Sequence, residues 1–122
     1  MATELTAPSD REVIERASGR AGVHARWMAT DELARRALER GDLLDVLCAV
    51  MRRDRATALR HVPYGTFMAV ARILDSGYER AIRRLFHGMD DWTAVERQDV
   101  LRPWAGCRRV AEATRELVAR HG

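Results

Sequence analysis

The feature that most constrains this sequence is an apolar stripe in the segment that follows Gly77. Six apolar side chains recur there at intervals of three and four residues, namely Tyr78, Ala81, Ile82, Leu85, Phe86 and Met89. This spacing places all six on one face of an α-helix, whereas a half-buried β-strand requires alternation with a period of two. The segment therefore predicts an amphipathic helix whose apolar face is buried against the rest of the chain.

Shorter stripes of the same kind run through most of the chain, and no segment alternates over the length of a strand. They comprise Leu33, Ala34, Ala37 and Leu38; Leu43, Val46, Leu47 and Val50; and Phe67, Val70, Ala71 and Leu74. We therefore expect an all-α fold, a compact bundle of six to eight short helices arranged as αα-hairpins. Residues 1–8 are expected to form a flexible N-terminal tail, and residues 9–122 a single helical domain.

Polar residues mark the expected starts of two helices. The sequences "SDRE" from Ser9 and "TAVE" from Thr93 have the spacing of a capping box, in which two side chains each accept from the other residue's backbone N–H. Just ahead of the second box, Asp90 or Asp91 is expected to open and N-cap that helix. A magnesium or general acid–base role is the alternative for this acidic pair.

Three further boundaries are expected from local signals. Residues 24–28 are predicted to form a short turn that tucks a tryptophan into the core, before a helix capped by Thr30 or Asp31. Charged residues at expected apolar positions predict a helix break near Asp54. A short helix and a Pro/Gly turn should then occupy residues 58–65, with another helix starting at Thr66.

Most of the charge is expected to neutralise itself along helix faces. The chain has 21 arginines, no lysine and 18 acidic residues, for a net charge of +3. Five acid–arginine pairs have the favourable i, i+4 order, which contributes ~0.2–0.5 kcal/mol per pair. They are Glu12–Arg16, Asp31–Arg35, Glu32–Arg36, Glu79–Arg83 and Glu116–Arg120.

One basic stretch has no such local balance. Its arginines are Arg52, Arg53, Arg55 and Arg60, and the only acid among them is Asp54. Such a stretch is a solvated face, a donor of ion pairs to another helix, or a contact for nucleic acid, an acidic protein or a phosphate-bearing ligand. No signature of a base-reading motif accompanies it, so any nucleic-acid contact is expected to involve the phosphate backbone.

The turn after this stretch is a second candidate binding feature. His61 and Tyr64 lie on either side of Pro63 in "HVPYG", and polar side chains at such turns often contact ligands. The alternative is ordinary punctuation between two helices, with the tyrosine half-buried.

Trp104 and Cys107 are candidates of a different kind. Trp104 lies between proline and glycine in "RPWAG"; it either locks a corner of the core or, if exposed, anchors a protein interface. Cys107 precedes two arginines at the start of the last expected helix, an environment that lowers the pKa of a thiol, so it is a candidate reactive thiol. Cys48, in "LLDVLCAVM", is expected to be a buried small hydrophobe.

The histidine spacing predicts no metal site. None of the four histidines forms an i, i+4 pair or an HExxH motif, which are the spacings of metal sites on helices. The nearest grouping is His87 with Asp90 and Asp91, for which a histidine favoured at a helix C-terminus is the simpler interpretation. We therefore predict no catalytic residues, no metal and no other cofactor.

These observations rank three functions. We expect a small non-catalytic helical module for protein–protein interaction, an adaptor or regulatory subunit, with another protein or a second copy of the chain as its partner. The alternative is an accessory subunit that contacts nucleic-acid backbone through Arg52–Arg60, and the third is an enzyme whose site is not visible in sequence. With no signal peptide, no apolar membrane-spanning run and two unpatterned cysteines, the expected location is the cytoplasm, without membrane contact.

Overall fold

The computed structural model describes residues 7–19, 22–57 and 64–121. Over these ranges the chain forms seven α-helices and one short 3₁₀ helix, and no strand, which confirms the predicted all-α class. The helices are α1 (Asp10–Ser18), α2 (Val23–Ala37), α3 (Gly41–Thr57), α4 (Tyr64–Asp75), α5 (Glu79–His87), α6 (Ala94–Leu101), η1 (Arg102–Trp104) and α7 (Arg108–His121). None of the described helices is both long enough and apolar enough to cross a bilayer.

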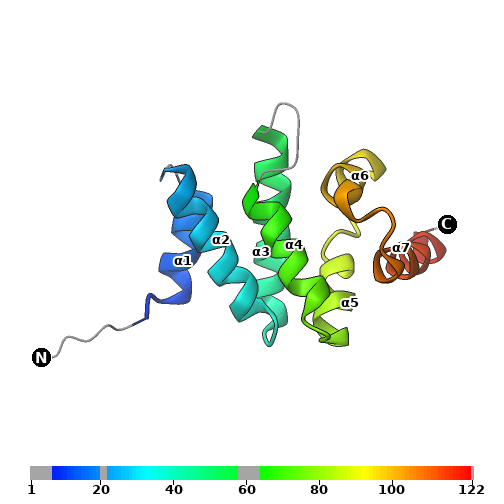
Figure 1. The fold of residues 1–122 in the computed structure, drawn as a ribbon, viewed down its shortest axis with the longest axis horizontal. Coiled ribbons are helices and arrows are strands. Elements are labelled where there is room, and N and C mark those ends of the chain that lie inside the picture. Colours follow the sequence, from blue (N-terminus) through cyan, green and yellow to red (C-terminus); the bar gives the residue numbers. More distant parts are fainter. Residues whose placement is uncertain (1–6, 20–21, 58–63, 122) are drawn as a thin grey trace, which may run out of the picture.

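The first five helices stack as antiparallel neighbours (Figure 1). In this view α2 and α4 lie in front, and α1 and α3 lie behind them. Helix α2 packs against α1, α3 and α4, while α5 packs against α3. Helices α6 and α7 lie at the far end of the stack from α1, with α6 against α3 and α7 against α5.

The apolar stripe after Gly77 forms part of the core, as its spacing predicts. Helix α5 buries Ala81, Ile82, Leu85 and Phe86, and Met89 is buried in the turn that follows it. Tyr78 is the exception, with 46% of its surface exposed. Its backbone is extended at the N-cap position of α5, so its side chain does not follow the helical stripe.

The predicted helix break near Asp54 is wrong, because α3 continues to Thr57. Asp54 is buried and forms an ion pair with Arg26 of α2. Arg52 and Arg55 form ion pairs with acidic residues of α6. The buried charge that interrupts the apolar stripe of α3 is thus met by a neighbouring helix, whereas Arg53 is exposed, and the backbone needs no break.

The predicted turn at residues 24–28 is also wrong, since α2 runs without interruption from Val23 to Ala37. Thr30 does not cap a helix; it is buried within α2, and its hydroxyl donates to the carbonyl of Arg26 at 2.8 Å. Helix α4 starts at Tyr64, two residues before the predicted start, and includes Gly65.

Gly65 has a packing role in α4. A Cβ at this position would lie 3.3 Å from Cδ1 of Trp27 and 3.6 Å from the Cβ of Thr30. The absence of a side chain therefore allows α4 to approach α2 closely. This contact could not be predicted from the Pro/Gly turn expected at Pro63 and Gly65. The helix predicted at residues 58–62 lies outside the described residues.

The two predicted helix starts are observed, but their caps differ. Thr93 and Glu96 form a complete capping box at α6, while the Ser9 hydroxyl accepts from the Glu12 backbone N–H of α1 at 3.2 Å. The expectation that Asp90 or Asp91 caps this helix is wrong, because Thr93 is its N-cap. Asp91 instead lies 3.7 Å from Arg52, and Asp90 lies 3.2 Å from Arg120.

Candidate functional site

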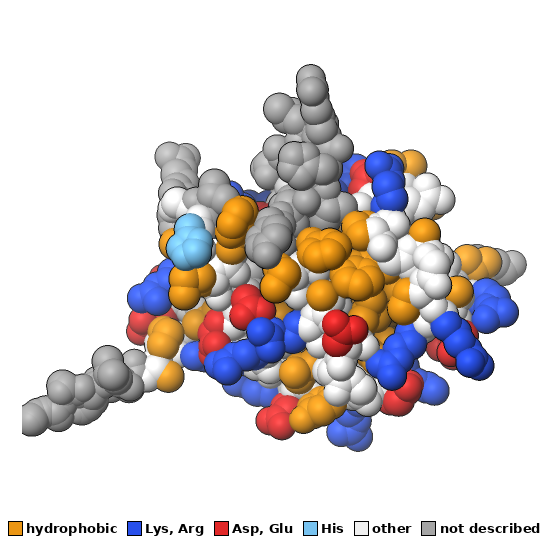
Figure 2. Space-filling view, viewed as in Figure 1, with side chains coloured by type: hydrophobic (Ala, Val, Ile, Leu, Met, Phe, Trp, Pro, Cys, Tyr) orange, Lys and Arg blue, Asp and Glu red, His pale blue; other side chains and the backbone are white. Residues whose placement is uncertain are grey.

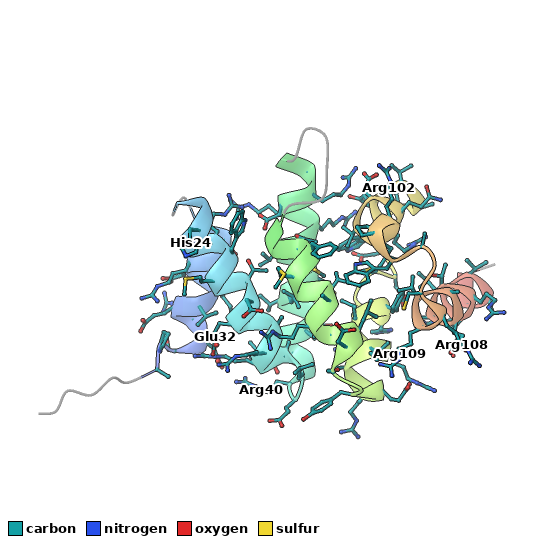
Figure 3. The ribbon with its side chains drawn as sticks, viewed as in Figure 1. His24, Glu32, Arg40, Arg102, Arg108 and Arg109 are labelled. Carbon is teal, nitrogen blue, oxygen red and sulfur yellow. The ribbon has the colours of Figure 1, made fainter. Side chains whose placement is uncertain are left out.

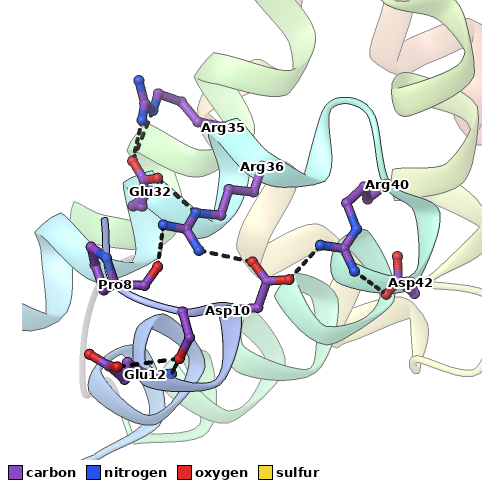
Figure 4. A network of polar contacts seen from close by, with 9 residues as sticks. Pro8, Asp10, Glu12, Glu32, Arg35, Arg36, Arg40 and Asp42 are labelled. Carbon is purple, nitrogen blue, oxygen red and sulfur yellow. Dashed lines mark hydrogen bonds and ion pairs between the residues drawn. The ribbon is translucent and has the colours of Figure 1, made fainter. Parts of the chain in front are cut away.

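Arginines clamp the stacked helices together, as the network between α1 and α2 illustrates (Figure 4). Arg36 donates to Glu32 at 2.8 Å, to Asp10 at 2.9 Å and to the carbonyl oxygen of Pro8 at 2.7 Å. Arg40 also donates to Asp10. Hydrogen bonds from Arg36 and then Arg40 lower the pKa of Asp10. Further clamps between helices join Arg26 to Asp54, Arg72 to Asp31, and Arg84 to Asp45.

These clamps replace two of the five predicted pairs within helices. The pairs Glu12–Arg16, Glu32–Arg36 and Glu79–Arg83 form at 3.7, 2.8 and 4.0 Å. Asp31 does not pair with Arg35, because Arg72 of α4 reaches it with two hydrogen bonds of 2.8 and 3.1 Å. Likewise Arg120 pairs with Asp90 and not with Glu116. Both losses have one cause, a partner from a distant part of the sequence that the i, i+4 rule does not consider.

The basic stretch is held partly by α6. Arg52 donates two hydrogen bonds of 2.9 Å to the carboxylate of Glu96. Arg55 donates to Asp99 at 3.0 Å. The Arg52 hydrogen bonds, followed by the backbone N–H of Thr93, lower the pKa of Glu96 to about 2. These two arginines therefore act as ion-pair donors between α3 and α6, one of the roles that the sequence left open.

The structure describes the other members of the predicted binding group only in part. Arg53 is exposed on α3 and has no ion pair within the described part of the chain. Arg60 and His61 lie outside the described residues. Tyr64 is the first residue of α4, and its side chain is likewise outside the description. The contact predicted for this group with a partner stays a prediction.

Trp104 takes part in an aromatic pair where η1 meets α4. Its ring stacks on Phe67 with centroids 5.1 Å apart and planes inclined by 21°. Both side chains are half-buried, and Trp104 also packs against the core. Met68 and Ala71 are half-buried on α4 as well. We call these four residues, Phe67, Met68, Ala71 and Trp104, the aromatic face.

Figure 2 shows hydrophobic side chains gathered over α4 and toward α6 and η1. The sequence pattern assigned Phe67 and Ala71 to a core stripe with Val70 and Leu74, yet only the latter two are buried. Periodicity identifies which residues share a helix face but not how much of that face a neighbouring helix covers. Phe67 and Met68 were therefore missed as candidates.

The indole of Trp104 is fixed by packing and not by hydrogen bonding. Its Nε1 atom is buried and has no acceptor among the described residues. A buried donor without a partner weakens the folded state. The stack on Phe67 and the contact with the core offset this cost.

Exposed arginines lie on η1, which also carries Trp104, and at the start of α7. Figure 3 labels Arg102 near η1 and Arg108 and Arg109 at the start of α7. The side chains of Arg102 and Arg108 are 74% and 90% exposed. Arg109 is also exposed and donates to the carbonyl oxygen of Leu74 at 2.7 Å, a neutral acceptor that leaves its charge uncompensated. We call these three residues the arginine rim.

The two cysteines have different surroundings. Cys48 is buried as predicted, and burial raises the pKa of its thiol to about 12. A Cβ added to Gly88 of the neighbouring turn would lie only 2.6 Å from its Sγ, which shows how tightly the thiol is packed. Cys107 is a half-buried free thiol just before α7, and its reactivity stays a prediction.

A groove of about 910 Å³ lies between the α2–α3 turn, α5 and α7. Its apolar lining includes Leu44 and Phe86, both nearly inaccessible. Its charged lining is mixed: arginines come mainly from α5, whereas Glu39 and Glu116 come from α2–α3 and α7. The groove therefore favours no single sign of charge.

His87, Asp90 and Arg120 meet at one end of this groove. His87 Nδ1 lies 3.2 Å from the carboxylate of Asp90 and 3.2 Å from the guanidinium of Arg120. His87 is thus the histidine at the end of α5 that the sequence suggested, held by an acid and a neighbouring helix. The described residues contain no group of three or more His, Cys, Asp or Glu side chains placed to hold a metal ion.

Comparisons of the chain with protein-family models, with curated proteins and with solved structures found no match.

Proposed function

We propose that this chain is a small non-catalytic module for protein–protein interaction, an adaptor or regulatory subunit, and that it binds its partner through the aromatic face. The observation that carries the proposal is the stack of Trp104 on Phe67, half-buried at the junction of η1 and α4. Tryptophan and arginine dominate the binding energy of protein interfaces, and methionine is enriched there. All three types meet at this surface.

The packing of the aromatic face suits rapid and specific binding. Trp104 is held by its stack and by the core, so its rotamer is restricted before any partner arrives. Binding therefore costs less side-chain entropy than it would for a freely rotating aromatic residue. The exposed arginine rim adds charge at the edge of the face, where charge governs partner choice and association rate.

The nucleic-acid alternative receives less support from the described residues. Arg52 and Arg55 already donate to Glu96 and Asp99, so phosphate contact would have to displace two carboxylates. Of the described arginines in that stretch, Arg53 alone is exposed without an ion pair. We propose the cytoplasm as the setting, because both Cys48 and Cys107 are free thiols.

Affinity purification from the native cell, with and without nuclease, tests the proposal. The bait is the full chain as wild type, as Trp104→Ala and as Met68→Ser. We expect a protein partner that survives nuclease treatment and is depleted at least about tenfold with either variant, since both remove apolar contact at the centre of the face. Met68 is included because its half-buried side chain can be shortened without removing the aromatic stack.

Val118→Ala is the matched control, because Val118 is an apolar residue of α7 with 61% exposure and lies outside the aromatic face. Its partner recovery should equal that of the wild type. Thermal unfolding of all variants separates loss of binding from loss of fold. A partner that is released by nuclease, or that is retained by both face variants, would overturn the proposal.

A further inference from the structure

Along the sequence, the net charge of the chain is concentrated in the segment that begins at η1, the 3₁₀ helix that carries Trp104. From Arg102 to the C-terminus the sequence has five arginines and two glutamates, a surplus equal to the whole net charge of +3. The preceding residues contain sixteen arginines and sixteen acids and are therefore balanced. By sequence, the surplus of arginine over acid therefore lies in the segment that forms η1 and α7.

The contacts within this segment leave most of that charge available. The Arg102 guanidinium lies 3.4 Å from Asp99, and Arg108 lies 2.9 Å from Glu112, but both arginines are largely exposed. Ion pairs at such exposure contribute little and exchange readily with solvent or with a partner. Arg109 has a backbone carbonyl as its acceptor, and Arg115 has no ion pair among the described residues.

The aromatic face forms a short apolar strip on α4. Phe67, Met68 and Ala71 follow the outward side of α4 over about one turn, and Trp104 extends the strip toward α6. A docked amphipathic helix presents residues i, i+3 or i+4 and i+7 over about 10 Å. On the α2 side, Arg72 is already neutralised by Asp31, whereas the exposed arginines of the described residues near Trp104 lie on η1 and at the start of α7.

We propose that the partner segment is an amphipathic helix with an acidic polar side, which places apolar residues on the aromatic face and carboxylates against the arginine rim. This inference rests on the proposed function and adds the chemistry of the partner. Carboxylates suit the rim because a guanidinium donates two parallel hydrogen bonds to them. The groove beside α7 is the weaker site for such a helix, since its arginines are interspersed with Glu39 and Glu116 and it favours no single sign of charge.

Three synthetic peptides of about 18 residues, roughly five helical turns, provide the test. All carry the same leucines on one face, and their polar positions are glutamate, glutamine or lysine. Binding to the full chain is measured by fluorescence anisotropy, with a labelled oligothymidine of about 20 nucleotides as the nucleic-acid probe. We expect the glutamate peptide to bind at least about tenfold more tightly than the lysine peptide.

Charge reversal at the rim should change this preference. In the double variant Arg102→Glu with Arg108→Glu, the glutamate peptide should bind about tenfold more weakly and the lysine peptide more tightly. The matched control is Arg80→Glu with Arg83→Glu on α5, which changes the net charge equally at exposed arginines that line the groove. This control should bind the glutamate peptide like the wild type.

Four outcomes would overturn the inference, and they differ in what they say about the proposed function. If the three peptides bind equally and binding still depends on Met68 and Trp104, the inference of an acidic partner is wrong, while the proposed interaction module stands. If the α5 control loses binding of the glutamate peptide, the helix docks in the groove beside α7 and not on the aromatic face. If the oligothymidine binds more tightly than every peptide, the arginine rim is a contact for nucleic-acid phosphates and not for carboxylates. If no peptide binds, the inference of a helical partner is wrong. The affinity purification with Trp104→Ala then tests the proposed interaction module independently.

Discussion

Two arginine-rich segments of this chain look alike in sequence and differ in structure. At the end of α3, Arg52 and Arg55 face Glu96 and Asp99 of α6, and their side chains are 38% and 24% exposed. Around η1 and the start of α7, Arg102 and Arg108 are 74% and 90% exposed. The first segment holds helices together, whereas the second faces solvent.

The difference teaches that a run of arginines does not reveal whether its charge is available. An ion pair between helices requires an acid that is near in space, and α6 supplies two acids to α3 from more than forty positions away. Among the described residues, helix α7 receives one acid from a distant part of the sequence, Asp90 at Arg120, and its arginines outnumber its glutamates. Availability of charge is therefore a tertiary property.

The largest expected effect comes from removing the acids that engage α3. Glu96→Ala with Asp99→Ala removes the carboxylates to which Arg52 and Arg55 donate, leaves Arg52 only the more distant Asp91, and also removes half of the capping box of α6. We expect a larger loss in the free energy of unfolding than for Thr93→Ala, whose lost N-cap costs about 1 kcal/mol. Urea unfolding measures both variants.

The same double variant should behave more like a basic protein. The released arginines of α3 should make it elute later from a heparin column than the wild type does. If its unfolding free energy and heparin elution both equal those of the wild type, then α6 does not engage the basic stretch.

A smaller effect is expected from acid. The pKa of Glu96 is about 2 in the folded chain, below the ordinary value of about 4.3 for glutamate in an unfolded chain. Its carboxylate therefore stabilises the fold above the unfolded pKa, and this contribution is lost as the pH falls from about 5 toward 2. Glu96→Gln, which retains a capping side chain, should match the wild type near pH 2 and be less stable at pH 7.

Asp54 contributes with the opposite sign to this pH dependence. Burial raises its pKa despite the attraction of Arg26, so protonation of Asp54 favours the folded state as the pH falls through its raised pKa. Urea unfolding of the wild type and of Glu96→Gln between pH 2 and pH 7 separates the two groups. A stability difference between these two proteins that does not change with pH would contradict the assignment to Glu96.

The smallest expected effect concerns the second segment. Arg108→Ala with Arg115→Ala should change the free energy of unfolding by no more than about 0.5 kcal/mol, because neither side chain clamps one helix to another. The variant should nevertheless elute earlier from heparin. A clear loss of stability would show that these arginines support the fold as those of α3 do.

Local patterns predicted much of the fold and less of the surface. The stripe of α5 and the capping box at Thr93 were predictable because both depend on residues within three or four positions of one another. The continuation of α3 through Asp54 was not, since the buried charge is matched by Arg26 of another helix. Trp104 was identified as an anchor candidate, but its partner Phe67 was assigned to the core because its helix face is covered only in part.

By itself, the sequence determined that this chain is helical, where most of its apolar faces lie and where several helices start. These properties follow from the 3.6-residue period and from hydrogen bonds between near neighbours. Only the tertiary structure decided which arginines are neutralised and which apolar residues remain half-exposed. Both depend on which distant helix lies alongside, because ion pairs and burial are set by distance in space and not by separation along the chain.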